Sequence, residues 1–470
     1  MYGKLRRDVV RAKQRLKASR WRREALPSLN SRVTYNGLPD KKMEDLPESP
    51  PNSLVQAEAS SLTIAILLAC AFASTACFPR PGSPGFFEVT SGDDAVDDNA
   101  GDGLCRSTLP GGPCTLRAAI QESNALIGES TILLGPRTHR LTLLDHLHVT
   151  DGVRMTGSGA TQTVIDGTDR GGRVFHFDGS LAWLTDLNII NGGPDVSSGG
   201  AIYIRNRAFV SLTNVVIDDN EAYTGGGGIH LEDGRLLLID SSVSDNRATG
   251  AFAGGIYVQA SGTLTIDRST IDSNRSNRCG GIYNFGRITV SNSTISGNSA
   301  GSTTRGTGGI INVGTAHFNN VTIYNNSSNA RGDAQSSGGL LSVDGSTRIT
   351  LSNTIIAGNT RGGAANDCTG RVTSYGYNLI QNADECTVTD IVAGNIIDRD
   401  PQLLPLAYNF GAATQSHLPA SFSPAINAGH PQVGPGVSAL GRCEARDQAN
   451  MMRQLTGSGR RCDIGSIEAR

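Results

Sequence analysis

Hydrophobic and polar residues follow one repeated pattern through the middle of the chain, from residue 199 to residue 359. Each of six copies opens with a glycine pair close before an aliphatic residue, which is Ile202, Ile229, Ile256, Ile282, Ile310 or Leu340. Each copy closes on an asparagine, which is Asn220, Asn246, Asn274, Asn298, Asn326 or Asn359. The opening residues are 26 to 30 positions apart. A repeat of this length predicts a stacked solenoid, because each unit buries its apolar face only against its neighbours.

Inside each copy the aliphatic residues stand at fixed distances from the closing asparagine. They occupy the positions three, eight and ten residues before it, as Ile271, Ile266 and Leu264 do before Asn274. Apolar residues two positions apart with polar residues between them predict β-strands that have one buried face. Each copy therefore predicts three short strands, which in this copy are 254–258, 264–266 and 269–271.

Stacking of aligned copies places equivalent strands about 4.8 Å apart, which is the spacing of a β-sheet. The expected fold is all-β, a right-handed parallel β-helix over residues 131–380 with three parallel sheets around a narrow aliphatic interior. We expect the asparagines at a tight turn, because asparagine tolerates a left-handed backbone and can hydrogen-bond to its equivalent in the next coil. Their expected role is structural.

Composition agrees with tightly wound β structure and narrows the range of partners. The 470 residues include 58 glycines, and aromatic residues make up only 5%. The net charge of −2 argues against a nucleic-acid partner, because such proteins usually carry a strongly basic surface. The eight histidines are scattered along the sequence, so we predict no metal site and no cofactor. An acidic run at 93–102 is interpreted either as a calcium-binding loop or as a solvated loop.

Six of the nine cysteines fall into near pairs, which are Cys105 with Cys114, Cys368 with Cys386, and Cys443 with Cys462. None of the pairs has the CxxC spacing of a metal site. Local pairs in a loop-rich chain predict disulfides, and disulfides imply an oxidising compartment. Cys279 is left over. Because Ala253 occupies the equivalent position one copy earlier, Cys279 is interpreted as a small buried residue.

The N-terminal part of the sequence indicates export. Residues 1–60 are basic and polar, and we interpret them as disordered or as lying upstream of the natural start. Residues 61–77 hold an apolar run of signal-peptide length, which is short for a membrane span. Cys70 and Cys77 lie in sequences like a lipoprotein cleavage box and are candidates for lipidation. We expect a secreted or cell-surface protein, and an outer-membrane lipoprotein is one form that it could take. The protein would attach to a membrane only through this signal or a lipid anchor.

A motif after this segment indicates how the solenoid begins. Residues 115–125 carry an apolar face at helical spacing, formed by Leu116, Ala119 and Ile120, and predict one short helix. The run Cys114-Thr115-Leu116-Arg117-Ala118-Ala119 resembles the core motif of the CSLREA domain. In that family the segment sits at the N-terminal end of exported β-helical proteins, so the resemblance implies an N-terminal cap over 85–130.

The C-terminal part, roughly 370–468, resembles the choice-of-anchor Q domain. The resemblance rests on motifs that include Ser423–Gly429 and Cys462–Gly465. It also implies an exported protein. Because a solenoid needs a cap over its exposed strand edges, we expect residues 381–470 to cover the open last coil.

Two sets of residues that vary between copies are candidates for ligand contact. The first is the outward position of the opening strand, which is Tyr203, His230, Tyr257 and Tyr283. Rings in register suit the stacking of a sugar, but the favoured interpretation is a packing ladder that stabilises neighbouring strands. The second set is an arginine in the loop after most asparagines, namely Arg247, Arg275, Arg305 and Arg331. These arginines are interpreted either as a row beside the rings that binds an acidic polysaccharide or as a solvated basic rim.

An enzymatic role is the alternative to binding or adhesion. The adjacent acids Asp218 and Asp219 are a poor start for acid–base hydrolysis, because neighbouring strand residues point to opposite faces. The sequence also lacks the motifs of polygalacturonases and pectate lyases. We therefore favour a non-catalytic surface protein that binds a polysaccharide or another cell-surface component, with a polysaccharide lyase or glycoside hydrolase acting on an acidic glycan as the alternative.

Overall fold

A computed structural model describes residues 84–168, 171–250, 252–331, 335–343, 348–432, 441–453 and 461–470. The chain divides into two units, Met1–Ala76 and Cys77–Arg470, and all the described residues belong to the second. The predictions for residues 1–60, for the signal at 61–77 and for lipidation of Cys70 or Cys77 therefore lie outside the described residues. No helix among the described residues is long and apolar enough to cross a membrane.

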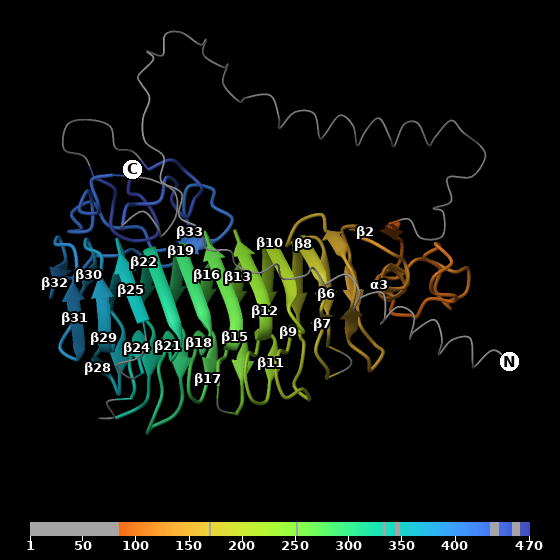
Figure 1. The fold of residues 1–470 in the computed structure, drawn as a ribbon, viewed down its shortest axis with the longest axis horizontal. Coiled ribbons are helices and arrows are strands. Elements are labelled where there is room, and N and C mark those ends of the chain that lie inside the picture. The colour runs from red at the N-terminus through yellow and green to blue at the C-terminus, as the bar shows by residue number, and fades with distance from the viewer. Residues whose placement is uncertain are drawn as a thin grey trace, which may run out of the picture. The chain divides into compact units, whose positions relative to one another are not determined.

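The second unit is a right-handed parallel β-helix, which confirms the predicted fold class (Figure 1). Three columns of strands stack coil upon coil, and their neighbouring strands pair in parallel. The strands of the middle column are the longest. Several continue around a corner into the third, and β12 (Ile229–Ile239) and β15 (Ile256–Asp267) also include the opening strand of their coil. Among the described residues, these strands form one 25-stranded sheet that wraps around the interior.

Within each column the strands follow one another in chain order, from the N-terminal coil onward. The opening column contains β4 (Leu147–Val149), β7 (Phe175–Asp178), β9 (Ile202–Arg205), β18 (Ile282–Asn284), β21 (Ile310–Asn312) and β24 (Leu340–Ser342). The middle column contains β1 (Phe86–Val89), β2 (Ser130–Leu134), β5 (Val153–Thr156), β8 (Leu181–Ile190), β10 (Ala208–Asp218), β12 (Ile229–Ile239), β15 (Ile256–Asp267), β19 (Arg287–Ser296), β22 (Thr315–Tyr324), β25 (Arg348–Ser352), β29 (Cys368–Ser374) and β31 (Cys386–Asp390). The third column contains β3 (Thr138–Arg140), β6 (Val164–Asp166), β13 (Ser242–Ser244), β16 (Thr270–Asp272), β26 (Ile355–Ala357), β30 (Leu379–Ile380) and β32 (Ile396–Ile397).

A fourth column of very short strands follows the asparagine turn and was not predicted. It forms a 7-stranded sheet of β11 (Glu221–Ala222), β14 (Arg247–Ala248), β17 (Arg275–Ser276), β20 (Ser299–Ala300), β23 (Ser327–Ser328), β27 (Thr360–Arg361) and β28 (Ala364–Ala365). Each strand has only two residues, which is too short for hydrophobic alternation to reveal it.

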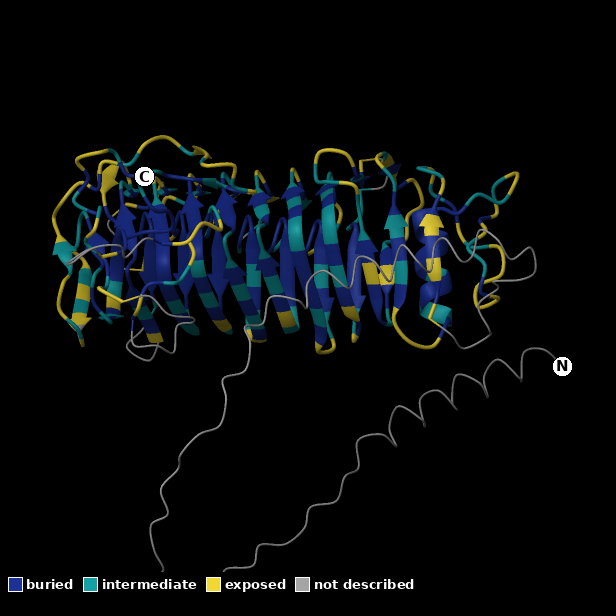
Figure 2. Cartoon of the chain, turned by 90° about the horizontal axis from the view of Figure 1, so that it is seen from above, coloured by how far each residue is buried: buried dark blue, intermediate teal, exposed yellow. Residues whose placement is uncertain are grey.

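The aliphatic positions predicted to face inward form the core. Ile217, Val243 and Ile271 lie in register on successive coils, and each is fully buried. In Figure 2, dark blue buried residues run along the strands of the solenoid, while exposed residues gather in the turns. Each coil therefore fills a continuous apolar interior together with its neighbours, as the repeat predicted.

The closing asparagines form a buried ladder. The Nδ2 group of each donates to the Oδ1 atom of the next, at 3.0 Å from Asn220 to Asn246 and at 2.9 Å from Asn298 to Asn326. The ladder ends where Asn359 donates to Asp367. One detail of the prediction was wrong, because the left-handed residue is the one just before each asparagine. That position holds Asp219, Asp245, Ser273, Gly297, Asn325 and Gly358.

The predicted helix is present as α3 (Leu116–Ala125), with Thr115 as its N-cap. Its apolar face is buried against the first coils. Arg117, from the same motif, forms a buried ion pair with Asp94, in which Nε lies 2.6 Å from Oδ1. The solenoid is longer than predicted at both ends, because β1 (Phe86–Val89) already pairs with β2 and β32 still pairs with β30.

The C-terminal segment lies along the flank of the solenoid, which corrects the prediction that it covers the last coil (Figure 1). Gln448 binds Thr270 on β16 and Thr294 on β19, and Asn353 donates to the carbonyl of Gly441. The segment contains a small hairpin of β33 (Ala407–Tyr408) and β34 (Gln415–Ser416). Outward hydroxyl and amide groups on neighbouring coils, such as those of Thr270, Thr294 and Asn319, supply its hydrogen-bond partners.

All three predicted disulfides are formed, namely Cys105–Cys114, Cys368–Cys386 and Cys443–Cys462. Cys279 is free and buried, as expected, and it lies beside Ala253 on the neighbouring coil.

Candidate functional site

The outward position of the opening column carries a stack of rings that is longer than predicted. The register pairs His148 with His176 and His176 with Tyr203, and it continues through His230 and Tyr257. Successive ring centroids in this stretch lie 4.8 to 5.1 Å apart. The two upstream histidines were missed, because the glycine-pair signature that marks later copies is weak in the first coils.

The downstream end of the stack is closed to ligands. Tyr283 is 3% exposed and His230 is 5% exposed. The loop before the next glycine pair folds over the rings, with Phe252 stacked 5.0 Å from Tyr257 and Arg278 above Tyr283. Tyr283 therefore belongs to the packing of this side of the solenoid, whereas His230, although only 5% exposed, still contributes to the wall of an upstream cleft.

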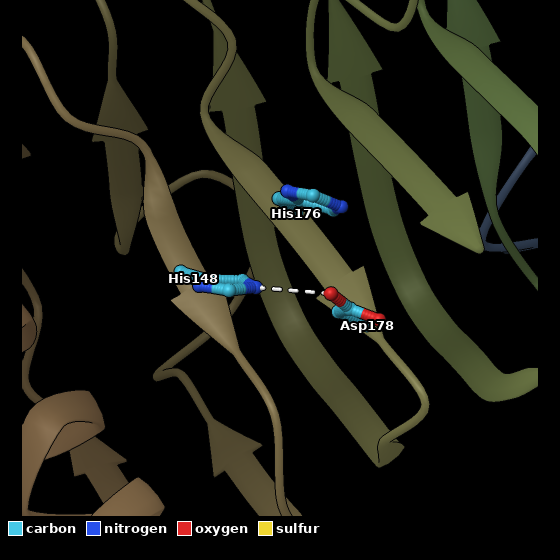
Figure 3. A group of neighbouring side chains, drawn as sticks. All are labelled: His148, His176 and Asp178. Carbon is cyan, nitrogen blue, oxygen red and sulfur yellow. Dashed lines mark ion pairs between the residues drawn. The ribbon is translucent and has the colours of Figure 1, made fainter. Parts of the chain in front are cut away.

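The upstream end of the stack gathers histidines and an acid. His148 lies on β4, and His176 and Asp178 lie on β7 (Figure 3). One ligand-type atom from each of the three lies within 4.8 Å of the others. His146 adds a third imidazole, whose Nε2 atom is 3.0 Å from Nδ1 of His176. The expectation that the histidines are scattered is thus wrong in space, because register between adjacent coils brings together residues that are about one coil apart in sequence.

The charge state of this group follows from burial and from hydrogen bonds. Burial, together with smaller contributions from His146, His148 and the nearby arginines, lowers the pKa of His176 to about 3. Burial by itself raises the pKa of Asp178, but hydrogen bonds from Asn206 and Arg205 outweigh it and lower the pKa overall. At neutral pH, His176 is therefore a neutral imidazole and Asp178 is a carboxylate.

A cleft of about 400 Å³ opens beside this group. Its walls include His146, Arg173, His176, Tyr203, Arg205, Ser197 and His230. The guanidinium of Arg173 lies 4.4 Å from the centre of the Tyr203 ring, which is a cation–π contact. Burial and the nearby Arg205 lower the pKa of Arg173. Arg205 in turn donates to Asp178 at 3.0 Å.

The four predicted arginines do not form a single row. Arg247 and Arg275 pair in register on β14 and β17, but the next two members of that column are Ser299 and Ser327. Arg305 and Arg331 lie further along longer loops, and all four arginines are exposed. Because the loops differ in length, arginines that occupy similar places in the sequence pattern do not lie in equivalent places on successive coils.

Acidic residues near the asparagine turn form a second titratable group. Asp272 is buried on β16, and its pKa is raised to about 6 by burial, with smaller contributions from Asp245 and Asp218. Asp219 occupies the left-handed turn position directly after Asp218. The acids suggested by the sequence thus belong to the turn region.

Comparison with known proteins identifies the architecture. The family described as right handed beta helix region matches residues 151–328 and 200–397. No curated protein matches the chain. The solved structure of pectate lyase Pel9A is similar at 13% identity with a TM-score of 0.48, and the match covers 83% of this chain and 97% of that one. The A-module of the Azotobacter vinelandii mannuronan C-5 epimerase AlgE6 is similar at 17% identity with a TM-score of 0.25, and the match covers 67% and 100%.

The family match spans more than half of the sequence, and the strand register described above agrees with it throughout. The chain belongs to the right-handed β-helix region family.

Proposed function

We propose that the protein binds an acidic saccharide in the cleft at the upstream end of the ring stack, without turning it over. The observation that carries this proposal is the guanidinium of Arg173. Among the described residues no carboxylate forms an ion pair with this guanidinium, and the guanidinium lies over the ring of Tyr203. A guanidinium held in this way keeps its N–H groups for a bidentate pair with a carboxylate.

The remaining walls of the cleft suit a sugar. Ser197 is exposed and Tyr203 is half-buried, so a hydroxyl donor and an aromatic edge line the same space as Arg173. The cleft volume of about 400 Å³ falls within the usual range for small-molecule sites, about 300–1,000 Å³. The site therefore suits one or two residues of a uronic-acid polymer rather than a long stretch of chain.

The proposed function includes export of the protein from the cytoplasm. Three disulfides are formed within the described residues, and disulfides persist mainly in oxidising compartments. The resemblances to the CSLREA and choice-of-anchor Q domains imply the same location. We infer a secreted or cell-surface protein with a binding or adhesion role.

The test is a titration with uronic-acid oligosaccharides in the presence of EDTA, followed by calorimetry. Wild-type protein is expected to bind the charged oligosaccharides and not their neutral counterparts. Arg173→Ala is expected to weaken binding at least tenfold, because it removes a charge-assisted pair. The matched control is an alanine triple variant of the exposed Arg275, Arg305 and Arg331. Equal affinity for wild type and Arg173→Ala would refute the cleft, and a loss confined to the triple variant would favour the outer arginines.

The enzymatic alternative needs a separate assay. Reducing ends and unsaturated products are measured over a panel of acidic polysaccharides. The proposed binding role predicts no product above the level of heat-inactivated protein. Product formation that is lost in Asp272→Asn would instead favour a lyase or hydrolase that uses the acidic group near the asparagine turn.

A further inference from the structure

We propose that His148, His176 and Asp178 bind a divalent transition-metal ion of the zinc type. The proposal concerns the protein alone and does not depend on a saccharide. Its first support is geometric, because one ligand atom from each of the three residues lies within 4.8 Å of the others (Figure 3). Two imidazole nitrogens and one carboxylate oxygen are ligands that zinc accepts, and imidazole favours zinc over calcium or magnesium.

The second support is an unpartnered nitrogen. His176 is only 6% exposed, and its Nε2 atom is buried without a hydrogen-bond partner. A buried polar atom left without a partner destabilises the folded protein. A metal ion bound next to His148 and Asp178 would give the Nε2 atom of His176 the partner that it lacks.

The surroundings orient the ligands in the way that metal sites require. The Nδ1 atom of His176 lies 3.0 Å from Nε2 of His146. If Nδ1 carries the proton and donates it to His146, the lone pair of His176 stays on Nε2, which is the tautomer a metal ligand needs. Arg205 donates to Oδ2 of Asp178 at 3.0 Å and Asn206 donates to its Oδ1, so both oxygens of the carboxylate are held in place.

The distances allow a metal ion after a small movement. Bonds of about 2.0–2.1 Å in a tetrahedral site place ligand atoms roughly 3.3 Å apart. The Nε2 atom of His148 is already 3.6 Å from Oδ2 of Asp178. The His148 side chain is 44% exposed, so its ring is free to turn the remaining distance toward His176.

Three protein ligands leave one coordination position for water or for a ligand oxygen. Arg173 and Arg205 stand next to the site, and their positive charges oppose a cation. They limit the affinity for the free ion and favour an anion at the fourth position. The expected site is thus an exchangeable one rather than a closed structural zinc site.

The experiment uses the full chain without a histidine tag, in a Cys70→Ser/Cys77→Ser background that removes competing thiols. After treatment with EDTA and dialysis, the protein is titrated with ZnCl₂ by calorimetry. We expect one zinc ion per chain, and Co²⁺ in place of zinc should give visible absorption bands of a low-coordinate site. His148→Ala and Asp178→Asn should each weaken zinc binding at least tenfold and abolish the cobalt bands.

The matched control is His317→Ala, which removes a half-buried histidine on β22 that pairs with Thr350. This variant should bind zinc like the wild type. Because His148 is exposed, its variant is expected to fold, and circular dichroism verifies this. The proposal is overturned if the wild type binds no zinc, or if His148→Ala and His317→Ala bind it equally well. Saccharide binding is measured in EDTA, so failure of the metal site and failure of the saccharide site are told apart.

Discussion

The asparagine ladder gives the sharpest prediction about stability, and Asn298 is its best test position. The side chain is fully buried. Its Nδ2 group donates to the carbonyls of Ile271 and Ser296 and to Asn326, at 2.9 to 3.0 Å. Its Oδ1 atom accepts from the backbone N–H and from the side chain of Asn274, at 3.0 and 2.9 Å. Five hydrogen-bond contacts therefore depend on one side chain, and one of the two N–H groups of Nδ2 is shared between two acceptors.

The cost of Asn298→Ala follows from these five bonds. The backbone N–H of Asn274 is left buried without a partner, which costs about 1–3 kcal/mol. The other four bonds contribute a net 0.5–1 kcal/mol each, as an order of magnitude. The Nδ2 group of Asn274 keeps its bond to the carbonyl of Val243, so it is not orphaned. The free energy of unfolding should fall by roughly 5 kcal/mol, which is large for a single substitution.

The assay is urea unfolding followed by far-ultraviolet circular dichroism. Asn277→Ala is the control, because Asn277 lies only three residues after Asn274, is exposed, and makes one hydrogen bond to the carbonyl of Thr249. This control should lose less than about 1 kcal/mol. A loss for Asn298→Ala below about 1.5 kcal/mol, or equal to that of the control, would show that the ladder does not stabilise the coils as argued.

Three further predictions concern other buried groups. Burial raises the pKa of Asp272 to about 6 from the ordinary 3.8, so its stabilising contribution is complete below pH 4 and is lost as the pH rises through 6. The free energy of unfolding of Asp272→Asn should therefore exceed that of the wild type by roughly 3 kcal/mol at pH 8 and should equal it at pH 4. A difference in urea midpoint that does not change with pH would contradict this. Arg117→Met removes the cation that pairs with the buried Asp94 carboxylate, which keeps the backbone N–H groups of Thr142 and Leu143 as donors. The substitution should destabilise the protein by about 3 kcal/mol in thermal unfolding, with partial recovery on adding Asp94→Asn. Burial raises the pKa of the Cys279 thiol to about 12, so mass spectrometry should find it unlabelled by thiol reagents until the protein unfolds; rapid labelling of native protein would argue against its burial.

The sequence was informative wherever the physics is local and repeated. The aliphatic residues at fixed distances from each asparagine determined the inward face, and Ile217, Val243 and Ile271 lie where that pattern put them. The short helix at Leu116–Ala125 and the three disulfides were also predictable, because each depends on residues close together in the chain. Strand alternation and cysteine spacing are local features of the sequence, so they can be recognised without the tertiary structure.

Which outward residues meet depends on how the coils stack, and the sequence pattern does not show this. His148 and His176 are 28 positions apart, and parallel register places their rings 4.8 Å from each other. The sequence could not show this, because the register of the first coils depends on irregular loops between β4 and β7. Loop length likewise separated Arg305 and Arg331 from the pair on β14 and β17. The repeated residues determine the fold of the solenoid. Its surface chemistry depends on how the residues that differ between copies stack on one another.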